Sequence, residues 1–310
     1  MTQLPALPAA VDIREVGPRD GLQAEAPVAP HDRAALAVAL MRAGARRIEA
    51  ASFVSPKAVP SMAGAAEVVA QLREALDEEV RPVVTALVPN VRGAADALEA
   101  GVDELTVTVA ASAVYNEKNV RRTIEESLSE IAQVVDLARE STPVDVVISC
   151  AFGSPYEEEI LPADVADLAR RVVEAGAAAL TLADTTGVAT PLRIGEVLDA
   201  VVAAVGEAPA SPGGRLGLHL HETRGTAMAN AFAGLELGIS RFDTSIGGLG
   251  GSPFAPGAGG NLATEDFAAF LAAMGIETGL DQTRLLEAAR LAERLVGHDL
   301  ASRVRTPLAS

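Results

Sequence analysis

Short apolar runs alternate with longer stretches of helical spacing along most of the chain. Four of the helical stretches end in glycine, at Gly44, Gly101, Gly176 and Gly238, and an apolar run follows each within two or three residues. Glycine after a helix adopts the left-handed conformation that closes the helix. An apolar run that is too short for a helix is typical of a buried strand. The pattern therefore predicts repeated βαβ units and a parallel sheet.

Eight strands and eight alternating helices are expected. The strands are predicted near residues 11–16, 46–51, 82–88, 103–109, 143–150, 178–183, 215–220 and 241–246. The helices are predicted near residues 31–43, 61–76, 91–100, 122–140, 162–175, 191–205, 225–237 and 264–274, with an additional helical segment near 280–296. Eight repeats favour an α/β fold of the closed (βα)8 TIM-barrel type.

An open doubly wound sheet is the alternative architecture. It would require a glycine-rich phosphate loop after the first strand, and the sequence has none there. No internal linker stands out, so the sequence predicts one catalytic domain over residues 1–310. Its barrel core would cover about residues 11–275, and a C-terminal helical extension would cover about residues 280–305.

The composition of the chain limits the kinds of partner that this barrel can bind. The chain of 310 residues carries a formal net charge of −17, which disfavours binding to nucleic acid. Cys150 is the only cysteine, so no disulfide can form within the chain. The N-terminal residues do not resemble a targeting segment, and no apolar run is long enough to span a membrane. We therefore expect a cytoplasmic protein without a nucleic-acid or membrane partner.

Polar residues gather at the predicted carboxyl ends of the strands, where barrel enzymes place their catalytic groups. These residues are Glu15, Arg19, Asp20, Gln23, Glu49, Ser52, Asn90, Ser149, Cys150, Asp184, Thr185, His219, His221, Ser252 and Asn261. The fold alone does not require polar groups at this rim. The gathering therefore indicates an active site.

His219 and His221 are the most specific local signal. Residues two apart on a strand point to the same face, so both imidazoles would enter the barrel mouth. Asp20 lies at another strand end that a closed barrel can bring nearby, and two histidines with a carboxylate form a plausible metal site. Two hydrogen-bonded histidines at a strand end are the alternative interpretation.

Other segments of the same rim allow both a functional and a structural interpretation. Arg19 could stabilise negative charge on an oxygen, or it could belong to a charged surface turn. Asp184 could be catalytic or a turn aspartate. The glycine-rich segment 247–261 predicts a mobile lid rather than a plain connector, and Asn261 at its end could offer a neutral oxygen to a metal.

Several motifs resemble those of the 3-hydroxy-3-methylglutaryl-CoA lyases, a family of the DRE-TIM metallolyase superfamily. They occur in the same order between about residue 11 and about residue 305. They are Glu-Val-Gly-Pro-Arg-Asp-Gly-Leu-Gln (15–23), Ser-Phe-Val-Ser-Pro-Lys (52–57), Ser-Cys-Ala-Phe-Gly-Ser-Pro-Tyr (149–156), Ala-Asp-Thr-Thr-Gly-Val (183–188), His-Leu-His-Glu-Thr-Arg-Gly (219–225) and the loop 247–261.

The resemblance implies a metal-dependent cleavage of a carbon–carbon bond in an acyl-CoA, yielding acetyl-CoA and acetoacetate. It implies four metal ligands, usually for Mg²⁺ or Mn²⁺, with Zn²⁺ also conceivable: Asp20, His219, His221 and Asn261. It further implies that Arg19 faces the thioester oxygen and that Glu49 and Asp184 are carboxylates of the inner site. Asp184 is our candidate for the base that removes the hydroxyl proton.

The chain also departs from the family's pattern. Ser252 stands where the family has a cysteine proposed as the acid, and a hydroxyl is a much weaker acid than a thiol. Ala26, Ala113 and Gly297 replace a lysine, a glutamate and an asparagine. Because several of these positions lie near CoA or the acyl group in the family, a related 3-hydroxy-3-substituted acyl-CoA is a competing substrate.

The residues that bind the CoA moiety are less well defined. Gln23, Lys57, Arg121 and Arg303 are candidates, and the three cations could equally be solvated surface charges. The family suggests a homodimer. Two other functions remain open: a Claisen-condensing synthase of the isopropylmalate or homocitrate synthase type, and a metal-binding barrel without catalysis.

Overall fold

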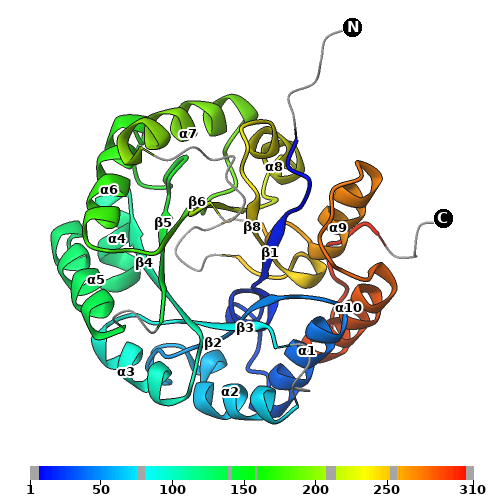
Figure 1. Cartoon of the computed structure of the whole chain (residues 1–310). Helices are drawn as coiled ribbons and strands as arrows, with labels where there is room; N and C mark the ends of the chain where they lie inside the picture. The colour runs from blue at the N-terminus through cyan, green and yellow to red at the C-terminus, as the bar shows by residue number, and fades with distance from the viewer. Residues whose placement is uncertain are drawn as a thin grey trace, which may run out of the picture.

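The computed structural model describes residues 7–75, 81–138, 142–157, 159–206, 214–251, 257 and 259–304. Eight parallel strands form a closed barrel in chain order, and β8 pairs with β1 to complete it. Figure 1 looks along this barrel and shows the helices arranged around it. The strands are β1 (Asp12–Glu15), β2 (Arg47–Ser52), β3 (Val83–Leu87), β4 (Glu104–Ala110), β5 (Val144–Ser149), β6 (Ala179–Asp184), β7 (Leu216–Leu220) and β8 (Arg241–Thr244).

The predicted TIM barrel is confirmed, and each strand lies within two residues of its predicted bounds. The helices are α1 (Pro30–Arg42), α2 (Ala65–Glu74), α3 (Val91–Glu99), α4 (Ala113–Val120), α5 (Ile124–Ala138), α6 (Pro162–Glu174), α7 (Pro191–Val205), α8 (Ala227–Glu236), α9 (Thr264–Ala273) and α10 (Gln282–Val296). The sequence did not predict α4, the π-helical turn η1 (Gly17–Gly21) or the 3-10 turns η2 (Pro60–Met62) and η4 (Ile246–Gly248).

The strands alternate between apolar and polar positions. On β5, Val146 and Ile148 belong to the hydrophobic core that the strands share with the helices, whereas Asp145 bonds to residues of other strands across the barrel. β4 follows the same rule, with Leu105 in the core and Thr106 facing inward. Successive side chains of a strand point to opposite faces. The barrel is therefore apolar outside, under the helices, and strongly polar inside.

Glu15 ties the barrel closure to the segments that follow β8. Its Oε1 accepts hydrogen bonds from the backbone N–H of Gly17 (2.8 Å) and Ile246 (3.0 Å), and its Oε2 accepts one from Thr264 Oγ1 (2.6 Å). The carboxyl group is fully buried. Burial raises the pKa of Glu15 to about 7, even though these hydrogen bonds favour the ionised form.

A raised carboxyl pKa makes the stability of the fold depend on pH. The folded protein holds the Glu15 proton more tightly than the unfolded chain does, whose ordinary pKa is 4.5. The resulting stabilisation is present below pH 4.5 and is lost as the pH rises towards about 7.

Replacing Glu15 with glutamine should remove this pH dependence, because the amide cannot ionise. We expect the unfolding free energy of the wild type to fall relative to that of Glu15→Gln as the pH rises from about 5 to about 7. Denaturant melts across that range provide the measurement. Glu99→Gln, on the exposed side of α3, is the control and should show no such trend. A Glu15→Gln difference that stays constant with pH would contradict the prediction.

Candidate metal centre

The turn η1 delivers Arg19 and Asp20 to the barrel mouth. The carbonyl oxygen of Val16 accepts hydrogen bonds from the backbone N–H of both residues, at 3.1 and 2.7 Å, which curls the chain tightly after β1. A Cβ atom at Gly17 would lie 2.7 Å from Glu15 Oε1. A larger residue at that position would require the side chain of Glu15 to shift, so glycine is favoured at the start of the turn.

The structure brings the predicted ligands together. His219 and His221, at the carboxyl end of β7, point into the barrel, and ligand atoms of Asp20, His219 and His221 all lie within 4.8 Å of one another. Asn261 joins them because its backbone forms a bridge with that of His221, and its Nδ2 donates to Asp20 Oδ2 at 2.7 Å. Such a group could hold a metal ion.

The outer nitrogens of the two imidazoles are held by acceptors. His219 Nδ1 lies 3.1 Å from Asp243 Oδ2, and His221 Nδ1 lies 3.0 Å from the carbonyl oxygen of Thr185. A carboxylate and a carbonyl can only accept, so each Nδ1 carries the hydrogen, and each ring offers its Nε2 lone pair when it is neutral. The two Nε2 atoms are 3.1 Å apart. Both lone pairs could therefore be offered to one ion.

Asn261 provides an independent test of whether these residues fit a metal. Its Nδ2 donates to Asp20 and to the carbonyl oxygen of Leu249 (2.8 Å), whereas its Oδ1 is buried and has no hydrogen-bond partner among the described residues. A buried oxygen without a donor is well suited to a hard cation. A Cβ atom at Gly250 would lie 2.2 Å from Asn261 Nδ2, so the residue that faces the amide must be glycine. The donor set therefore fits a divalent ion.

The surroundings of Asp20 and His221 favour their ligand forms, whereas the pKa of His219 is raised, because its burial is outweighed by its hydrogen bond to Asp243 and the charges of Asp20 and Asp243. Burial alone would raise the pKa of Asp20, but the charges of Arg19, His219 and His221 and a hydrogen bond from Asn261 together lower it. Burial, with the charge of His219 added, lowers the pKa of His221 to about 4. Asp20 is therefore a carboxylate and His221 a neutral imidazole near neutral pH.

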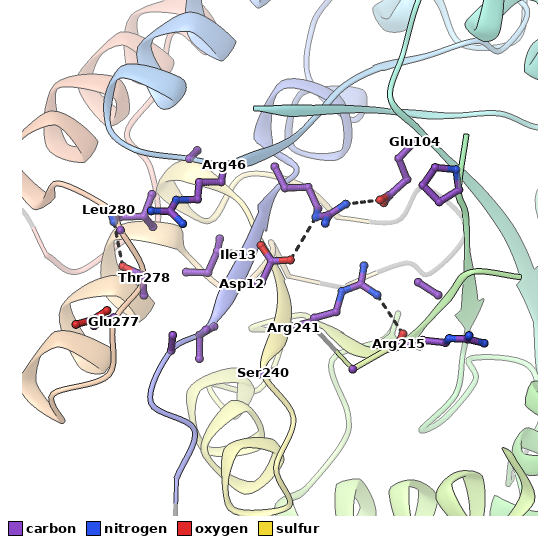
Figure 2. A pocket seen from close by; sticks show the side chains of 18 of the residues that line it. Asp12, Ile13, Arg46, Glu104, Arg215, Ser240, Arg241, Glu277, Thr278 and Leu280 are labelled. Carbon is purple, nitrogen blue, oxygen red and sulfur yellow. Dashed lines mark hydrogen bonds and ion pairs between the residues drawn. The ribbon is translucent and has the colours of Figure 1, made fainter. Parts of the chain in front are cut away.

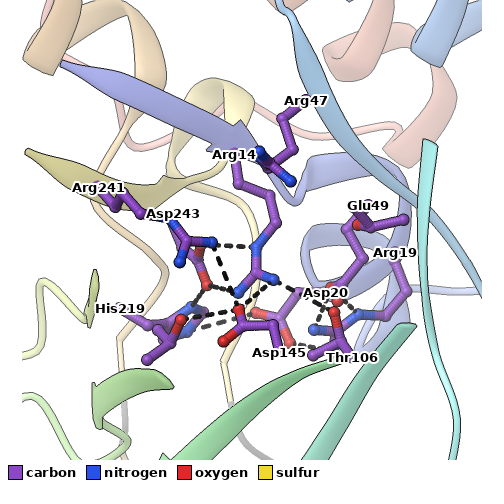
Figure 3. A network of polar contacts seen from close by, with 12 residues as sticks. Arg14, Arg19, Asp20, Arg47, Glu49, Thr106, Asp145, His219, Arg241 and Asp243 are labelled. Carbon is purple, nitrogen blue, oxygen red and sulfur yellow. Dashed lines mark hydrogen bonds and ion pairs between the residues drawn. The ribbon is translucent and has the colours of Figure 1, made fainter. Parts of the chain in front are cut away.

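Arg19 lies next to this cluster and is held from two sides. Its Nη1 donates to Asp20 Oδ1 at 2.6 Å, and its Nε and Nη2 both contact Glu49 Oε2. Glu49 is fully buried on β2 and thereby anchors the guanidinium. Figure 3 shows Arg19 between Glu49 and Asp20. The predicted trio of Arg19, Asp20 and Glu49 is thus one connected group.

A cavity of about 110 Å³ opens beside the cluster. Residues that the sequence analysis had not selected also line it, notably Tyr115 and Asn119 of the unpredicted helix α4. Ser112 caps that helix by accepting from Tyr115 N at 2.9 Å, and this cap was the available sequence signal. The lining residues are Arg19, Asp20, Gln23, Leu87, Thr108, Tyr115, Asn119, Val147, Ser149, Ala183, Thr185, His219, His221, Asp243 and Gly251.

Asp184 does not line this cavity. Its Oδ1 and Oδ2 accept from the backbone N–H groups of Val188 and Ala189, both at 3.1 Å, and its side chain is fully buried. Asp184 pairs in register with Leu220, an outward-facing core residue, whereas its neighbour Ala183 pairs with the inward-facing His219. The sequence allowed Asp184 to be either catalytic or a turn aspartate. These contacts are those of a turn aspartate, and they do not support Asp184 as the base.

Of the other predicted site residues, one lines the cavity and three are exposed. Gln23 lines the cavity, Lys57 and Arg121 are exposed, and the exposed Arg303 pairs with Glu222 at 3.5 Å. Ser252 lies outside the described residues, as do residues 253–256 and 258 of the predicted lid. The lid and the role of Ser252 stay predictions.

A second cavity, of about 590 Å³, lies at the opposite end of the barrel. It is formed around the first residues of the strands, including Asp12, Glu104 and Arg241 (Figure 2). Barrel enzymes carry their chemistry at the carboxyl ends of the strands. The smaller cavity beside His219 is therefore the candidate active site.

The geometry defines a barrel with a candidate metal centre and an arginine at its mouth. A family model described as HMGL-like matches residues 10–292. A hydroxymethylglutaryl-CoA lyase of Bacillus subtilis is 40% identical, over 96% of this chain and 96% of that protein. A 3-hydroxy-3-isohexenylglutaryl-CoA/hydroxymethylglutaryl-CoA lyase of Pseudomonas aeruginosa is 41% identical, over 97% and 98%.

A solved structure agrees with these relatives. The crystal structure of hydroxymethylglutaryl-CoA lyase from Pseudomonas aeruginosa superposes with a TM-score of 0.89 at 40% identity, covering 96% of this chain and 97% of that one. The chain belongs to the HMGL-like family of the DRE-TIM superfamily and is a lyase. The resemblance found in the sequence is thereby confirmed. In the described residues, no helix is long and apolar enough to cross a membrane.

Asp184→Asn should distinguish a structural from a catalytic aspartate. An asparagine can accept from only one of the two backbone N–H groups, so we expect the unfolding free energy to fall by about 1–3 kcal/mol. The lyase kcat should change by no more than a few-fold, whereas loss of a general base lowers it by about 10²-fold or more. Asp199→Asn, on the exposed side of α7, is the matched control. A large drop in kcat with unchanged stability would restore Asp184 as the base.

Proposed function

We propose that this protein cleaves 3-hydroxy-3-methylglutaryl-CoA to acetyl-CoA and acetoacetate with the help of Mg²⁺ or Mn²⁺. The observation that carries the proposal is the convergence of Asp20, His219, His221 and Asn261 beside Arg19, at the carboxyl end of the barrel. The names of the relatives support the substrate class. Because those relatives are lyases, cleavage is favoured over condensation.

The four ligands would hold the ion where the substrate enters. A divalent ion bound there acidifies a hydroxyl group and polarises carboxylate oxygens. Oxygen and imidazole ligands suit Mg²⁺ and Mn²⁺, and Zn²⁺ is a further candidate. His219 and His221 keep their Nε2 atoms directed at that position because Asp243 and Thr185 occupy their Nδ1 atoms.

Arg19 would bind the thioester oxygen. A guanidinium has five N–H donors. Three contacts on Arg19 are taken by Glu49 and Asp20, so two N–H donors remain for an oxygen on which negative charge develops. When the C2–C3 bond breaks, its electron pair moves into the enolate of acetyl-CoA, which Arg19 stabilises. Glu49 keeps the guanidinium in place throughout.

Two proton transfers complete the reaction. Since Asp184 is turned away, we assign removal of the tertiary hydroxyl proton to Asp20, whose carboxylate lines the cavity. Loss of that proton turns the C3 alcohol into the ketone of acetoacetate as the C2–C3 bond breaks. A second proton must reach the enolate carbon, and Ser252, or a water that it holds, is the proposed donor.

The residues that bind the CoA moiety and the oligomeric state of the protein stay predictions. Gln23 lines the cavity and could bind the acyl end of the substrate. Lys57, Arg121 and Arg303 are proposed partners of the CoA phosphates. A homodimer and a cytoplasmic location are likewise proposed.

A second candidate substrate carries a larger group at C3. One relative is named for both 3-hydroxy-3-isohexenylglutaryl-CoA and hydroxymethylglutaryl-CoA. The cavity lining includes the apolar Leu87 and Val147, against which an alkyl group could pack. Comparing kcat/KM for the methyl and the isohexenyl thioesters decides between the two candidates.

The first experiment incubates the purified protein with Mg²⁺ or Mn²⁺ and 3-hydroxy-3-methylglutaryl-CoA and follows the release of acetyl-CoA. We expect cleavage that EDTA abolishes and that His219→Ala lowers by about 10²-fold or more, because the metal loses a ligand. His31→Ala, an exposed histidine on α1, is the matched control and should retain full activity. Metal binding without cleavage of any thioester would refute the proposed lyase reaction.

Ser252→Cys should increase turnover if protonation of the enolate limits the rate. A thiol is a stronger acid than a hydroxyl, and well-placed general acids accelerate reactions by about 10²–10⁴-fold. We therefore expect kcat to rise by about tenfold while KM changes little, and Ser252→Ala to lower kcat. If all three proteins turn over at the same rate, another group supplies the proton.

A further inference from the structure

Arg14 lies inside the barrel, directly below the metal centre. Its Nε and Nη2 donate to Oδ1 and Oδ2 of Asp243, at 2.8 and 2.7 Å, so the fork binds both oxygens of that carboxylate. Its Nη1 donates to Asp145 Oδ2 at 2.6 Å and to Thr106 Oγ1 at 3.2 Å. Figure 3 shows the guanidinium between these partners, with His219 on the far side of Asp243. Arg14 is thus fixed by strands on two sides of the barrel.

Asp243 connects Arg14 to the metal centre. The same Oδ2 that accepts from Arg14 Nη2 lies 3.1 Å from His219 Nδ1. The strand register supports this connection, because Asp243 pairs with Arg14 on one side and with His219 on the other. Arg14, Asp243 and His219 therefore form a continuous chain across three adjacent strands, β1, β8 and β7.

Because the series of contacts from Arg14 through Asp243 to His219 is buried, it depends on the guanidinium of Arg14. Arg14 is 3% exposed and Asp243 is 6% exposed, so water contributes little to either charge. A buried carboxylate that loses its donors turns towards another donor. Without the fork of Arg14, the carboxylate of Asp243 could rotate away from His219 Nδ1. The imidazole would then lose the acceptor that orients its Nε2 towards the other ligands.

We propose that Arg14 is a positioning residue of the metal centre. Its fork fixes the orientation of the Asp243 carboxylate, and Asp243 in turn holds the Nδ1–H of His219, so that the Nε2 lone pair faces Asp20 and His221. Asp145 secures the opposite end of the guanidinium. The inference rests on the proposed metal-dependent function, but it concerns metal affinity and not the acyl-CoA substrate.

A purely structural role for Arg14 makes a different prediction. Arg47 is a second arginine inside the barrel and pairs with Glu104 and, at 3.3 Å, with Asp12, nearer the amino ends of the strands. If Arg14 only neutralised charge in the barrel, its loss and the loss of Arg47 should have the same kind of effect. Arg47→Met is therefore the matched control for Arg14→Met.

The test measures Mn²⁺ binding to the full-length proteins without substrate, by titration calorimetry and by the EPR signal of free Mn²⁺. Outer partners of metal-bound histidines typically contribute 10–100-fold to metal affinity. We expect Arg14→Met to raise the Mn²⁺ dissociation constant by about 10–100-fold and Arg47→Met to leave it unchanged within error. Melting temperatures in EDTA report the structural cost of each variant separately.

A double-mutant cycle tests whether Arg14 acts through Asp243. Asp243→Asn should weaken Mn²⁺ binding by itself, and adding Arg14→Met to it should cause little further loss. If the two substitutions weaken Mn²⁺ binding by independent, additive amounts, Arg14 does not act through Asp243. An unchanged Mn²⁺ affinity in Arg14→Met, whatever its melting temperature, would overturn the positioning role.

Arg14→Lys decides the question if Arg14→Met does not fold. Lysine keeps the charge but lacks the planar fork that holds both oxygens of Asp243. Weaker Mn²⁺ binding at an unchanged melting temperature in EDTA supports the proposal, and unchanged binding refutes it. Wild-type protein that binds Mn²⁺ but cleaves no thioester would refute only the proposed function. Wild-type protein that binds no Mn²⁺ would refute both.

Discussion

Ionised side chains inside a closed barrel must be paired with one another, because water cannot reach them, and the rest of this structure depends on that constraint. Removing one partner from a buried ion pair leaves a charge that typically costs 3–5 kcal/mol. Charged residues deep in this barrel therefore have partners from other segments: Arg14 of β1 pairs with Asp145 of β5 and Asp243 of β8, and Arg19 of η1 pairs with Glu49 of β2. Most barrels of this class fill the same space with branched apolar side chains.

This pairing gives the metal centre its geometry. Asp20 is held between Arg19 and Asn261, and His219 is held by Asp243, so the ligand atoms converge without the ion having to assemble them. The loops after β1 and β8 supply Asp20 and Asn261, while β7 supplies the imidazoles from a rigid strand end. A site of this kind loses little conformational entropy when it binds a ligand. Its cavity is small and lined mostly by polar residues, together with the apolar Leu87 and Val147.

The elements that the sequence predicted well are those with a local physical cause. Strands β2, β4, β6 and β8 could be located because apolar runs follow helix-closing glycines, and the His219–His221 pair could be recognised because strand geometry places alternate residues on one face. Asp184 illustrates the opposite case. Its sequence context allows either a catalytic or a turn aspartate, and the contacts with Val188 and Ala189, which appear only in the folded barrel, favour the turn aspartate. Helix α4 was missed because eight residues carry too little periodic signal.

The sequence by itself determined the barrel, the family and the identity of the candidate metal ligands, because each depends on short motifs and on the spacing of apolar residues. The tertiary structure decided which charged residues meet. Arg14, Asp145 and Asp243 lie on three strands separated by up to 229 positions, and their pairing exists only once the barrel has closed. Charged residues at alternate positions, Asp12 and Arg14 on β1 and Arg241 and Asp243 on β8, were a visible signal. Choosing their partners, however, requires the register of β1, β5 and β8, which long-range packing sets.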